Sequence, residues 1–292
     1  MCDDFIHPRV MQTGIDPYLK ISRRAFSITL VALAGAAGAA SIPEKVVEKD
    51  VDITTADGVC DAVLFTPHKA GHFPAVLLWT DIFGLRPAFR EMGRRLAAEG
   101  YVVLIPNAFY RSQRAPIVTG EVDLSDAESR KRLYVLRDAI GRPGLERDAS
   151  TFIRYLDAQP KTNRKVKAGV QGYCMGGPFS FVTAATVPDR IGAVASFHGG
   201  IGLATDEATS PHLLIPKSRA TFLVVQAQND DVRDPLTKDR LKTAFAAAGR
   251  PAKVEVYPAN HGWCVKGSAD YDEVQAERAW SELLSLYRVT LV

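Results

Sequence analysis

The sequence predicts an α/β fold, with a doubly wound, mostly parallel sheet, helices on both of its faces and an N-terminal antiparallel hairpin. Short segments that are apolar at most positions recur along the chain, as expected for strands covered on both faces. Helical patterns separate these segments, which indicates a βαβ series. The hydrophobic fraction of 47% and the charged fraction of 24% are those of a chain that buries a full core.

The first elements predicted are the two strands of a hairpin. Residues 51–55 and 60–65 alternate apolar with polar side chains around the turn signal Asp57-Gly58. The pattern then changes to continuous apolar runs, which favour buried parallel strands. These runs are residues 75–79, 101–105, 166–170, 193–197, 220–225 and 253–257.

Helices are expected between the strands. An apolar stripe over residues 89–99 ends at Gly100, residues 236–248 end at Gly249, and residues 271–286 form the last long helix. In the longest connection, Ser125-Asp126-Ala127-Glu128 is a capping box that begins a helix to about Ile140, and residues 144–158 predict another. Residues 109–122 lack periodicity and are expected to be a loop over the functional site.

One pentapeptide refines the fold class. Gly172-Tyr173-Cys174-Met175-Gly176 stands between a predicted strand and a helical segment that begins near Pro178. A strand, a sharp turn with glycines on both sides of a nucleophile, and a helix form the nucleophile elbow of the α/β-hydrolase fold, here with cysteine in place of serine. The alternative is a small buried thiol in a glycine-rich turn.

An acid and a histidine follow in the order that this fold requires. Asp230 follows the strand that ends near Val225, and His261 follows the last strand. Asp231 competes with Asp230 as the acid, either aspartate could be a turn former, and a loop histidine could simply be solvated.

The residue types predict the roles. Because a cysteine attacks as thiolate, His261 is expected to hold the proton while Asp230 orients its ring. The oxyanion formed by attack on a carbonyl needs fixed donors, for which we predict the backbone N–H groups of Met175 and Ile82. His198, at the next strand end, either lines the pocket or is a surface turn residue.

At these residues the chain resembles the dienelactone hydrolase family, whose elbow carries cysteine with an aspartate and a histidine downstream. The resemblance covers roughly residues 51–286 and implies hydrolysis of esters or lactones through an acyl-thiol intermediate, with no cofactor. Asp81-Ile82-Phe83-Gly84-Leu85-Arg86 matches the family's acidic-x-aromatic-Gly segment. It implies that Asp81, where the family usually has glutamate, accepts the thiol proton and couples thiolate formation to substrate binding.

The resemblance also implies a set of substrate-binding residues. Arg111 corresponds to one of two arginines that bind the substrate carboxylate; its alternative is a surface ion pair. Val265 stands at the place of the second arginine, with Lys266 one position beyond, and lysine does not reproduce the two-pronged arginine contact. Side chains expected to complete this set are Phe83, Tyr110, His198 and Trp263.

The N-terminus differs from the rest. Residues 1–43 form a predicted leader in which Arg23-Arg24 precede an Ala/Gly-rich apolar run, a pattern similar to a twin-arginine export signal. Export to the periplasm is therefore expected, and the alternative is an uncleaved helix on a cytoplasmic enzyme. The run is too short for a comfortable membrane span. Residues 44–292 are predicted to form one hydrolase domain.

Composition excludes several function classes. The net charge of +3 is small and its cations are spread along the chain, which argues against a nucleic-acid partner. Four cysteines are too few and too scattered for a disulfide scaffold or a metal site. The expected partner is a small ester or lactone, and the protein is expected to be a monomer or a weak homo-oligomer.

Two other functions remain as alternatives to a hydrolase. One is a thiol redox protein that pairs Cys174 with Cys264, and the other is a binding protein on a decayed hydrolase scaffold.

Overall fold

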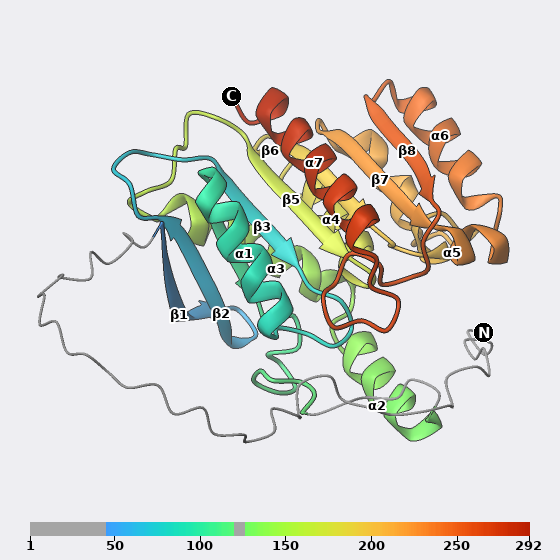
Figure 1. Cartoon of the computed structure of the whole chain (residues 1–292), viewed down its shortest axis with the longest axis horizontal. Coiled ribbons are helices and arrows are strands. Elements are labelled where there is room, and N and C mark those ends of the chain that lie inside the picture. The colour runs from blue at the N-terminus through green and yellow to red at the C-terminus, as the bar shows by residue number, and fades with distance from the viewer. Residues whose placement is uncertain (1–44, 120–125) are drawn as a thin grey trace, which may run out of the picture. The chain divides into compact units, whose positions relative to one another are not determined.

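The computed structural model describes residues 45–119 and 126–292 (Figure 1). The leader predicted at residues 1–43 lies outside these residues, so export stays a prediction. The described residues all belong to one compact unit.

The described part of the chain contains one eight-stranded sheet in the order β1-β2-β4-β3-β5-β6-β7-β8. β2 is antiparallel to both β1 and β4, and every later pairing is parallel. The predicted hairpin and parallel sheet are therefore confirmed. The strands are β1 (Val46–Thr55), β2 (Gly58–Pro67), β3 (Ala75–Trp79), β4 (Val102–Pro106), β5 (Ala168–Tyr173), β6 (Ile191–Phe197), β7 (Thr221–Ala227) and β8 (Ala252–Tyr257).

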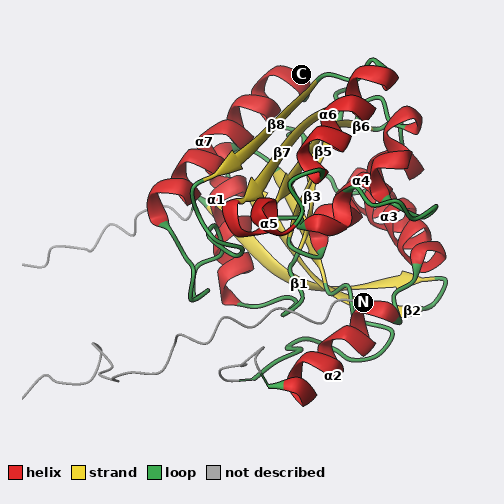
Figure 2. Cartoon of the chain, turned by 90° about the vertical axis from the view of Figure 1, so that its right-hand side faces the viewer, coloured by secondary structure: helices red, strands yellow, loops and turns green. Residues whose placement is uncertain are grey.

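Helices cover both faces of the sheet, as Figure 2 shows from the side. The long helices are α1 (Pro87–Glu99), α2 (Ala127–Asp138), α3 (Arg142–Asp157), α4 (Gly176–Thr186), α6 (Thr237–Ala248) and α7 (Glu273–Thr290). α1 and α7 pack with one set of strand side chains, and α3, α4 and α6 pack with the other set. Strands buried on both faces explain the continuous apolar runs of the sequence.

The helix ends follow local signals in the sequence. α1 begins at Pro87, whose fixed φ suits the first helical turn, and ends at Gly100 in the left-handed conformation. Asp126 caps α2 by accepting a hydrogen bond from the backbone N–H of Ser129, and Gly249 ends α6. The five helices predicted with residue ranges therefore lie within a few residues of α1, α2, α3, α6 and α7.

Three segments differ from the sequence-based predictions. β5 lies further along the chain than residues 166–170 and runs directly into Cys174. The polar turn expected after β7 is instead the short helix α5 (Gln228–Arg233). Residues between β6 and β7 include two 3-10 segments, η1 (Ile201–Leu203) and η2 (Pro211–Lys217), which no periodic pattern indicated.

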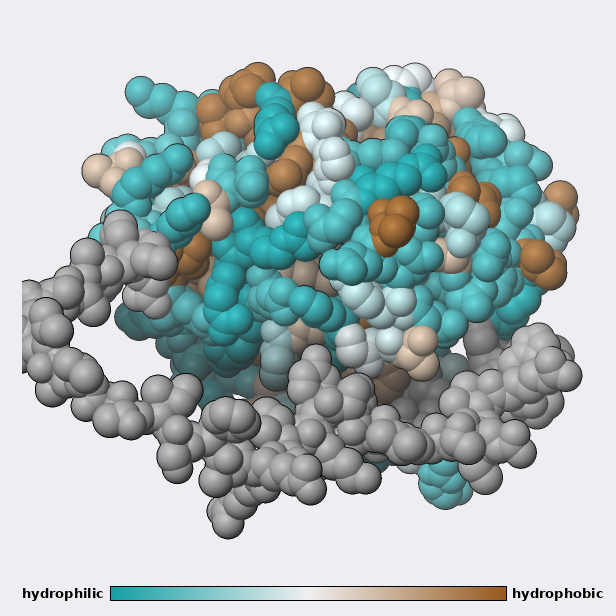
Figure 3. Space-filling view, viewed as in Figure 1, coloured by the Kyte–Doolittle hydropathy of each residue, from teal (hydrophilic) through white to brown (hydrophobic). Residues whose placement is uncertain are grey.

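The outer surface matches this layering. Figure 3 shows that the face carrying α1 and α7 is largely hydrophilic, with hydrophobic residues in small separate groups.

No helix among the described residues is both long enough and apolar enough to cross a membrane.

A buried carboxylate ties the hairpin to the helical layer. Asp148 on α3 is 1% exposed and accepts hydrogen bonds from the Tyr110 hydroxyl at 2.8 Å and from the Arg111 guanidinium at 2.7 and 2.9 Å. Arg111 also contacts Asp57, in the turn between β1 and β2, at 2.5 Å. The connection after β4 is therefore held between the hairpin and α3.

Asp148→Ala is expected to lower the free energy of unfolding by about 3 kcal/mol, because it leaves the largely buried Arg111 without its main partner. Urea unfolding followed by tryptophan fluorescence measures this loss. The matched control is Asp189→Ala, which removes the exposed ion pair with Arg219 and is expected to cost at most about 0.5 kcal/mol. Equal losses in the two variants would contradict the structural role of Asp148.

Candidate active site

The elbow is a strained turn that only small neighbours permit. Cys174 joins β5 to α4 with φ of +51°, a left-handed value that is uncommon for a residue with a side chain. A Cβ atom on Gly172 would lie 1.8 Å from the Gly176 carbonyl oxygen, and one on Gly176 would lie 2.5 Å from that of Trp79. Both glycines are therefore required by close backbone approach, which is the reason for their spacing around the cysteine.

The same close approach brings the predicted oxyanion donors to one edge of the sheet. Gly176 packs on the carbonyl groups that end β3, and the chain continues from there into Asp81 and Ile82. Met175 is the first residue of the turn into α4, where backbone N–H groups have no intrahelical acceptor. A carbonyl oxygen near Cys174 would thus lie beside the segments that carry both predicted donors.

His261 and Asp230 meet at the end of the neighbouring strands. Nδ1 of His261 lies 2.6 Å from Oδ2 of Asp230, whose side chain is 1% exposed. The backbone N–H of His261 donates to Oδ1 of Asn229 at 2.9 Å, which fixes the histidine loop to α5. Asp231 instead binds Lys238 at 2.7 and 2.9 Å. The structure therefore brings Asp230, rather than Asp231, to the histidine.

The charges around His261 favour its protonated form. Burial by itself lowers the pKa of His261, but the charge of Cys174 and hydrogen bonds with Asp230 and Cys174 raise it well above its usual value. Two acidic groups that face this partly buried ring therefore outweigh the effect of burial on its pKa. Such a ring holds the proton that a cysteine thiolate has given up.

Asp81 has a partner that the sequence interpretation missed. Arg86 donates to Oδ1 and Oδ2 of Asp81 at 2.5 and 2.7 Å, and the Phe83 backbone N–H donates to Oδ1 at 3.0 Å. The Arg86 guanidinium also lies over the rings of Phe83 and Phe89, at 5.4 and 4.9 Å from their centroids. The carboxylate predicted to accept the thiol proton is thus engaged by a guanidinium. The sequence could have indicated this ion pair, because Arg86 stands five residues after Asp81 in the same loop and carries the opposite charge.

Arg111 and Tyr110, predicted to bind substrate, are engaged elsewhere. Both contact the buried Asp148, and the Arg111 guanidinium also binds Asp57. A substrate carboxylate would have to replace these contacts, so the ion-pair alternative describes Arg111 in this structure.

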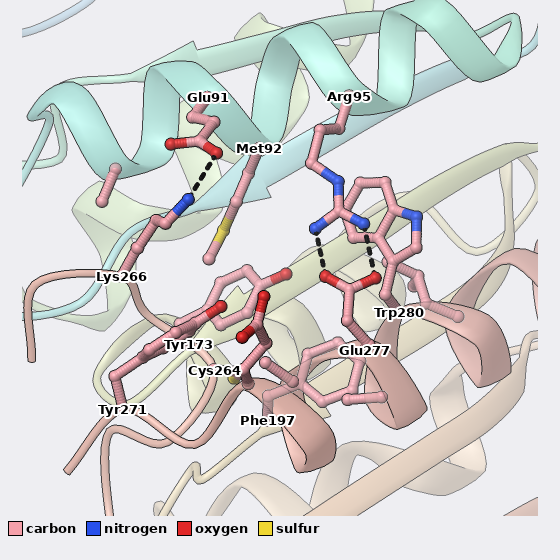
Figure 4. A pocket seen from close by; sticks show the side chains of 15 residues that line it. Glu91, Met92, Arg95, Tyr173, Phe197, Cys264, Lys266, Tyr271, Glu277 and Trp280 are labelled. Carbon is pink, nitrogen blue, oxygen red and sulfur yellow. Dashed lines mark hydrogen bonds and ion pairs between the residues drawn. The ribbon is translucent and has the colours of Figure 1, made fainter.

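Lys266 lies at the rim of a groove between α1 and α7, shown in Figure 4. The groove has a volume of about 260 Å³, and the ion pairs Lys266–Glu91, at 3.2 Å, and Arg95–Glu277, at 2.8 Å, cross it. Tyr173, Phe197 and Cys264 also line it. Lys266 is thus a rim residue paired with a carboxylate rather than part of the Cys174 turn.

The described cysteines Cys60, Cys174 and Cys264 are all free thiols. Burial raises the pKa of both Cys60 and Cys264, so neither forms a thiolate readily. Cys174 is partly exposed, unlike the other two. These properties give no support to a Cys174–Cys264 redox pair. Among the described residues, no cluster of three or more His, Cys, Asp or Glu side chains could hold a metal ion.

His198 and Trp263 are placed differently from the prediction that they bind substrate. Their side chains are 1% and 0% exposed, and the His198 ring packs edge-to-face against both His261 and Trp263. The His198 ring therefore lies between those of His261 and Trp263, and the two buried side chains offer no surface to a substrate. Phe83 is half-buried beside Asp81, and its contact with substrate stays a prediction.

Comparisons with known proteins agree with this architecture. The model of the dienelactone hydrolase family matches residues 60–291. A carboxymethylenebutenolidase of Pseudomonas putida is 32% identical over 136 residues, which are 46% of this chain and 55% of that protein. A carboxymethylenebutenolidase of Rhodococcus opacus is 27% identical over 66% of this chain and 71% of its own length. The crystal structure of a dienelactone hydrolase-like promiscuous phosphotriesterase from metagenomic libraries superposes with a TM-score of 0.69, at 22% identity, over 85% of this chain and all of that one.

Iodoacetamide is expected to label Cys174 at least about tenfold faster than Cys264 near neutral pH. The raised pKa of His261 keeps its ring protonated above pH 6.5, so the reactive ion pair should persist while an ordinary thiol stays protonated. Peptide mapping after timed alkylation measures both rates, with Cys174→Ala as the control that identifies the labelled peptide. Similar slow labelling of the two cysteines would contradict the thiolate–imidazolium pair.

Proposed function

The chain belongs to the dienelactone hydrolase family, and from this premise we propose that it hydrolyses carboxylic esters or lactones through Cys174, His261 and Asp230. One observation carries the proposal: His261 lies 2.6 Å from the buried carboxylate of Asp230, and the charge of Cys174, a residue with left-handed backbone, raises the pKa of that histidine. A nucleophile, a base within reach of it and a third group that orients the base form the arrangement needed for covalent catalysis.

In the first half of the reaction the Cys174 thiolate attacks the substrate carbonyl carbon. The new C–S bond forms while the carbonyl π electrons move to oxygen. Collapse of this tetrahedral intermediate breaks the C–O bond, and the His261 imidazolium gives its proton to the departing alkoxide. The products of this half are an acyl-thiol on Cys174 and an alcohol, which for a lactone stays attached to the acyl group.

Water completes the reaction. Neutral His261 takes a proton from water as the oxygen attacks the acyl-thiol carbonyl, and the C–S bond breaks to return the thiolate. The carboxylic product leaves, and His261 is again an imidazolium beside Cys174. Asp230 stays ionised throughout and keeps Nδ1 of His261 directed toward itself, so that the other ring nitrogen serves Cys174.

The oxyanion is proposed to bind the backbone N–H groups of Met175 and Ile82. The contact of Gly176 with the end of β3 supports this pairing, because it joins the two segments at the elbow. Backbone N–H groups held by packed elements do not have to move when negative charge develops on the oxygen. They therefore stabilise the transition state more than the ground state.

Asp81 and Arg86 are proposed to connect substrate binding with activation of the thiol. A substrate carboxylate would compete with Asp81 for the Arg86 guanidinium. The charge of Arg86 also lowers the pKa of His198, whose ring packs against that of His261. Once Arg86 binds the substrate, Asp81 is free to accept the proton of Cys174 in those protein molecules whose Cys174 is still a thiol. Arg86 binds one carboxylate whereas Arg111 binds two, so Arg86 becomes the preferred candidate for carboxylate recognition, and its planar guanidinium suits that contact.

Cys174→Ala is expected to lower kcat for p-nitrophenyl acetate by at least about 10³-fold, because no other described thiol lies at the elbow. Cys264→Ala is the matched control and should keep kcat within about twofold of the unchanged protein. Stopped-flow or plate-reader assays of nitrophenolate release measure both. Retention of turnover by Cys174→Ala would contradict the proposed nucleophile.

Arg86→Met is expected to raise KM about tenfold for a lactone that carries a carboxylate, and to leave KM for a neutral aryl ester nearly unchanged. The reason is that the variant removes the cation but keeps an unbranched side chain beside Phe83. Lys266→Met serves as the control cation, with no expected preference between the two substrates. Equal losses on both substrates would contradict carboxylate recognition by Arg86.

A further inference from the structure

His198 follows β6 in the same way that Cys174 follows β5, and the last residues of the two strands are paired. Each residue directly follows its strand, and their φ values are +38° and +51°. The backbone N–H of His198 donates to the carbonyl oxygen of Val225 at 2.8 Å, which holds the strained residue in place. Two neighbouring strands thus end in non-glycine left-handed residues, a feature that clusters at functional sites.

The side chain of His198 is buried against the catalytic histidine. Its ring centroid lies 4.8 Å from that of His261 at an interplanar angle of 64°, and 5.0 Å from that of Trp263 at 72°. Neither ring nitrogen has a hydrogen-bond partner among the described residues. Burying polar nitrogens in this way is unfavourable, and a phenyl ring of similar shape would avoid that cost. Packing alone therefore does not explain an imidazole here.

The groups around the ring keep it neutral. Those that face it and carry charge or titrate are His261 after β8, Arg86 in the loop after β3 and Tyr173 at the end of β5. Burial is the main cause that lowers the pKa of His198 well below its usual value, and the charges of His261 and Arg86 lower it further. While His261 is an imidazolium, a second positive ring against it is thus disfavoured.

A neutral imidazole is strongly polar, with an N–H at one nitrogen and a lone pair at the other. No hydrogen bond with another described residue selects the tautomer of His198, so the field of the neighbouring charge can select it. The favoured tautomer is the one that turns the negative end of the ring toward the His261 cation. Such a dipole acts strongly in this position because little water screens it.

We propose that His198 is a positioning residue for His261, in which a neutral ring orients the catalytic imidazole and its dipole stabilises the imidazolium that pairs with the Cys174 thiolate. This inference rests on the proposed function, since it assigns His198 an effect on the same ion pair. It differs from the predicted contact with substrate, because His198 acts through His261.

The test uses the full-length protein and two substitutions. His198→Phe keeps a planar ring but removes the dipole, whereas His198→Asn keeps a dipole and a side chain that tolerates left-handed backbone. Iodoacetamide alkylation of Cys174 is followed from about pH 5 to about pH 9. In His198→Phe the rate near pH 6 should fall about fivefold and the midpoint of the profile should move up by about 0.5 to 1 pH unit.

His198→Asn should show less than half of that shift, even if the loss of ring packing lowers kcat. An unchanged profile in His198→Phe, or an equal shift in both variants, would overturn the role of the dipole. Slow alkylation of the unsubstituted protein would instead contradict the proposed Cys174–His261 pair. Failure of the function and failure of this inference are therefore distinguishable.

A second measurement does not depend on the variants folding. Histidine ¹⁵N NMR of the unsubstituted protein should show the His198 ring neutral from about pH 5 to about pH 9, while the His261 ring is protonated near neutrality. Titration of His198 near pH 6.5 would overturn the proposal, because a ring that readily becomes positive cannot stabilise the neighbouring imidazolium.

Discussion

The site depends on one backbone constraint, the left-handed turn at Cys174. Its φ of +51° is a value that residues with side chains rarely adopt, and the turn closes only because Gly172 and Gly176 have no side chains. The same close packing sets α4 against the end of β3, so that the elbow, the Asp81 loop and the N-terminus of a helix share one edge of the sheet. The cost of the strained turn is offset by the packed elements on either side.

Charge compensation is the second feature that organises this edge. The carboxylates of Asp230 and Asp81 are both nearly inaccessible to water. Asp230 is paired with His261, and Asp81 is paired with Arg86. A buried charge without a partner would be strongly destabilising, which explains the close geometry of both pairs. The two pairs differ in consequence. The first holds a ring in one orientation, whereas the second neutralises the buried Asp81 carboxylate in the loop after β3.

The parts of the fold that local chemistry specifies were predictable. Apolar runs indicated the strands, the capping box at Asp126 began α2, and glycines ended α1 and α6. Some errors came from segments where tertiary contacts decide the conformation. Polar residues after β7 fold into the short helix α5, whose first residue is held by a backbone hydrogen bond to Ala259, 31 positions further along. A contact at that separation leaves no local pattern, because neither segment is periodic.

The sequence by itself determined the order of the strands and helices, the elbow and the chain order of cysteine, aspartate and histidine, since each depends on residue type and local spacing. Only the tertiary structure decided which side chains meet. It paired Asp230 rather than Asp231 with His261, joined Arg86 to Asp81, engaged Arg111 with Asp148, and placed the His198 ring against that of His261. The physical reason is that ion pairs and ring contacts are set by distances between elements far apart along the chain, and residue spacing does not encode such distances.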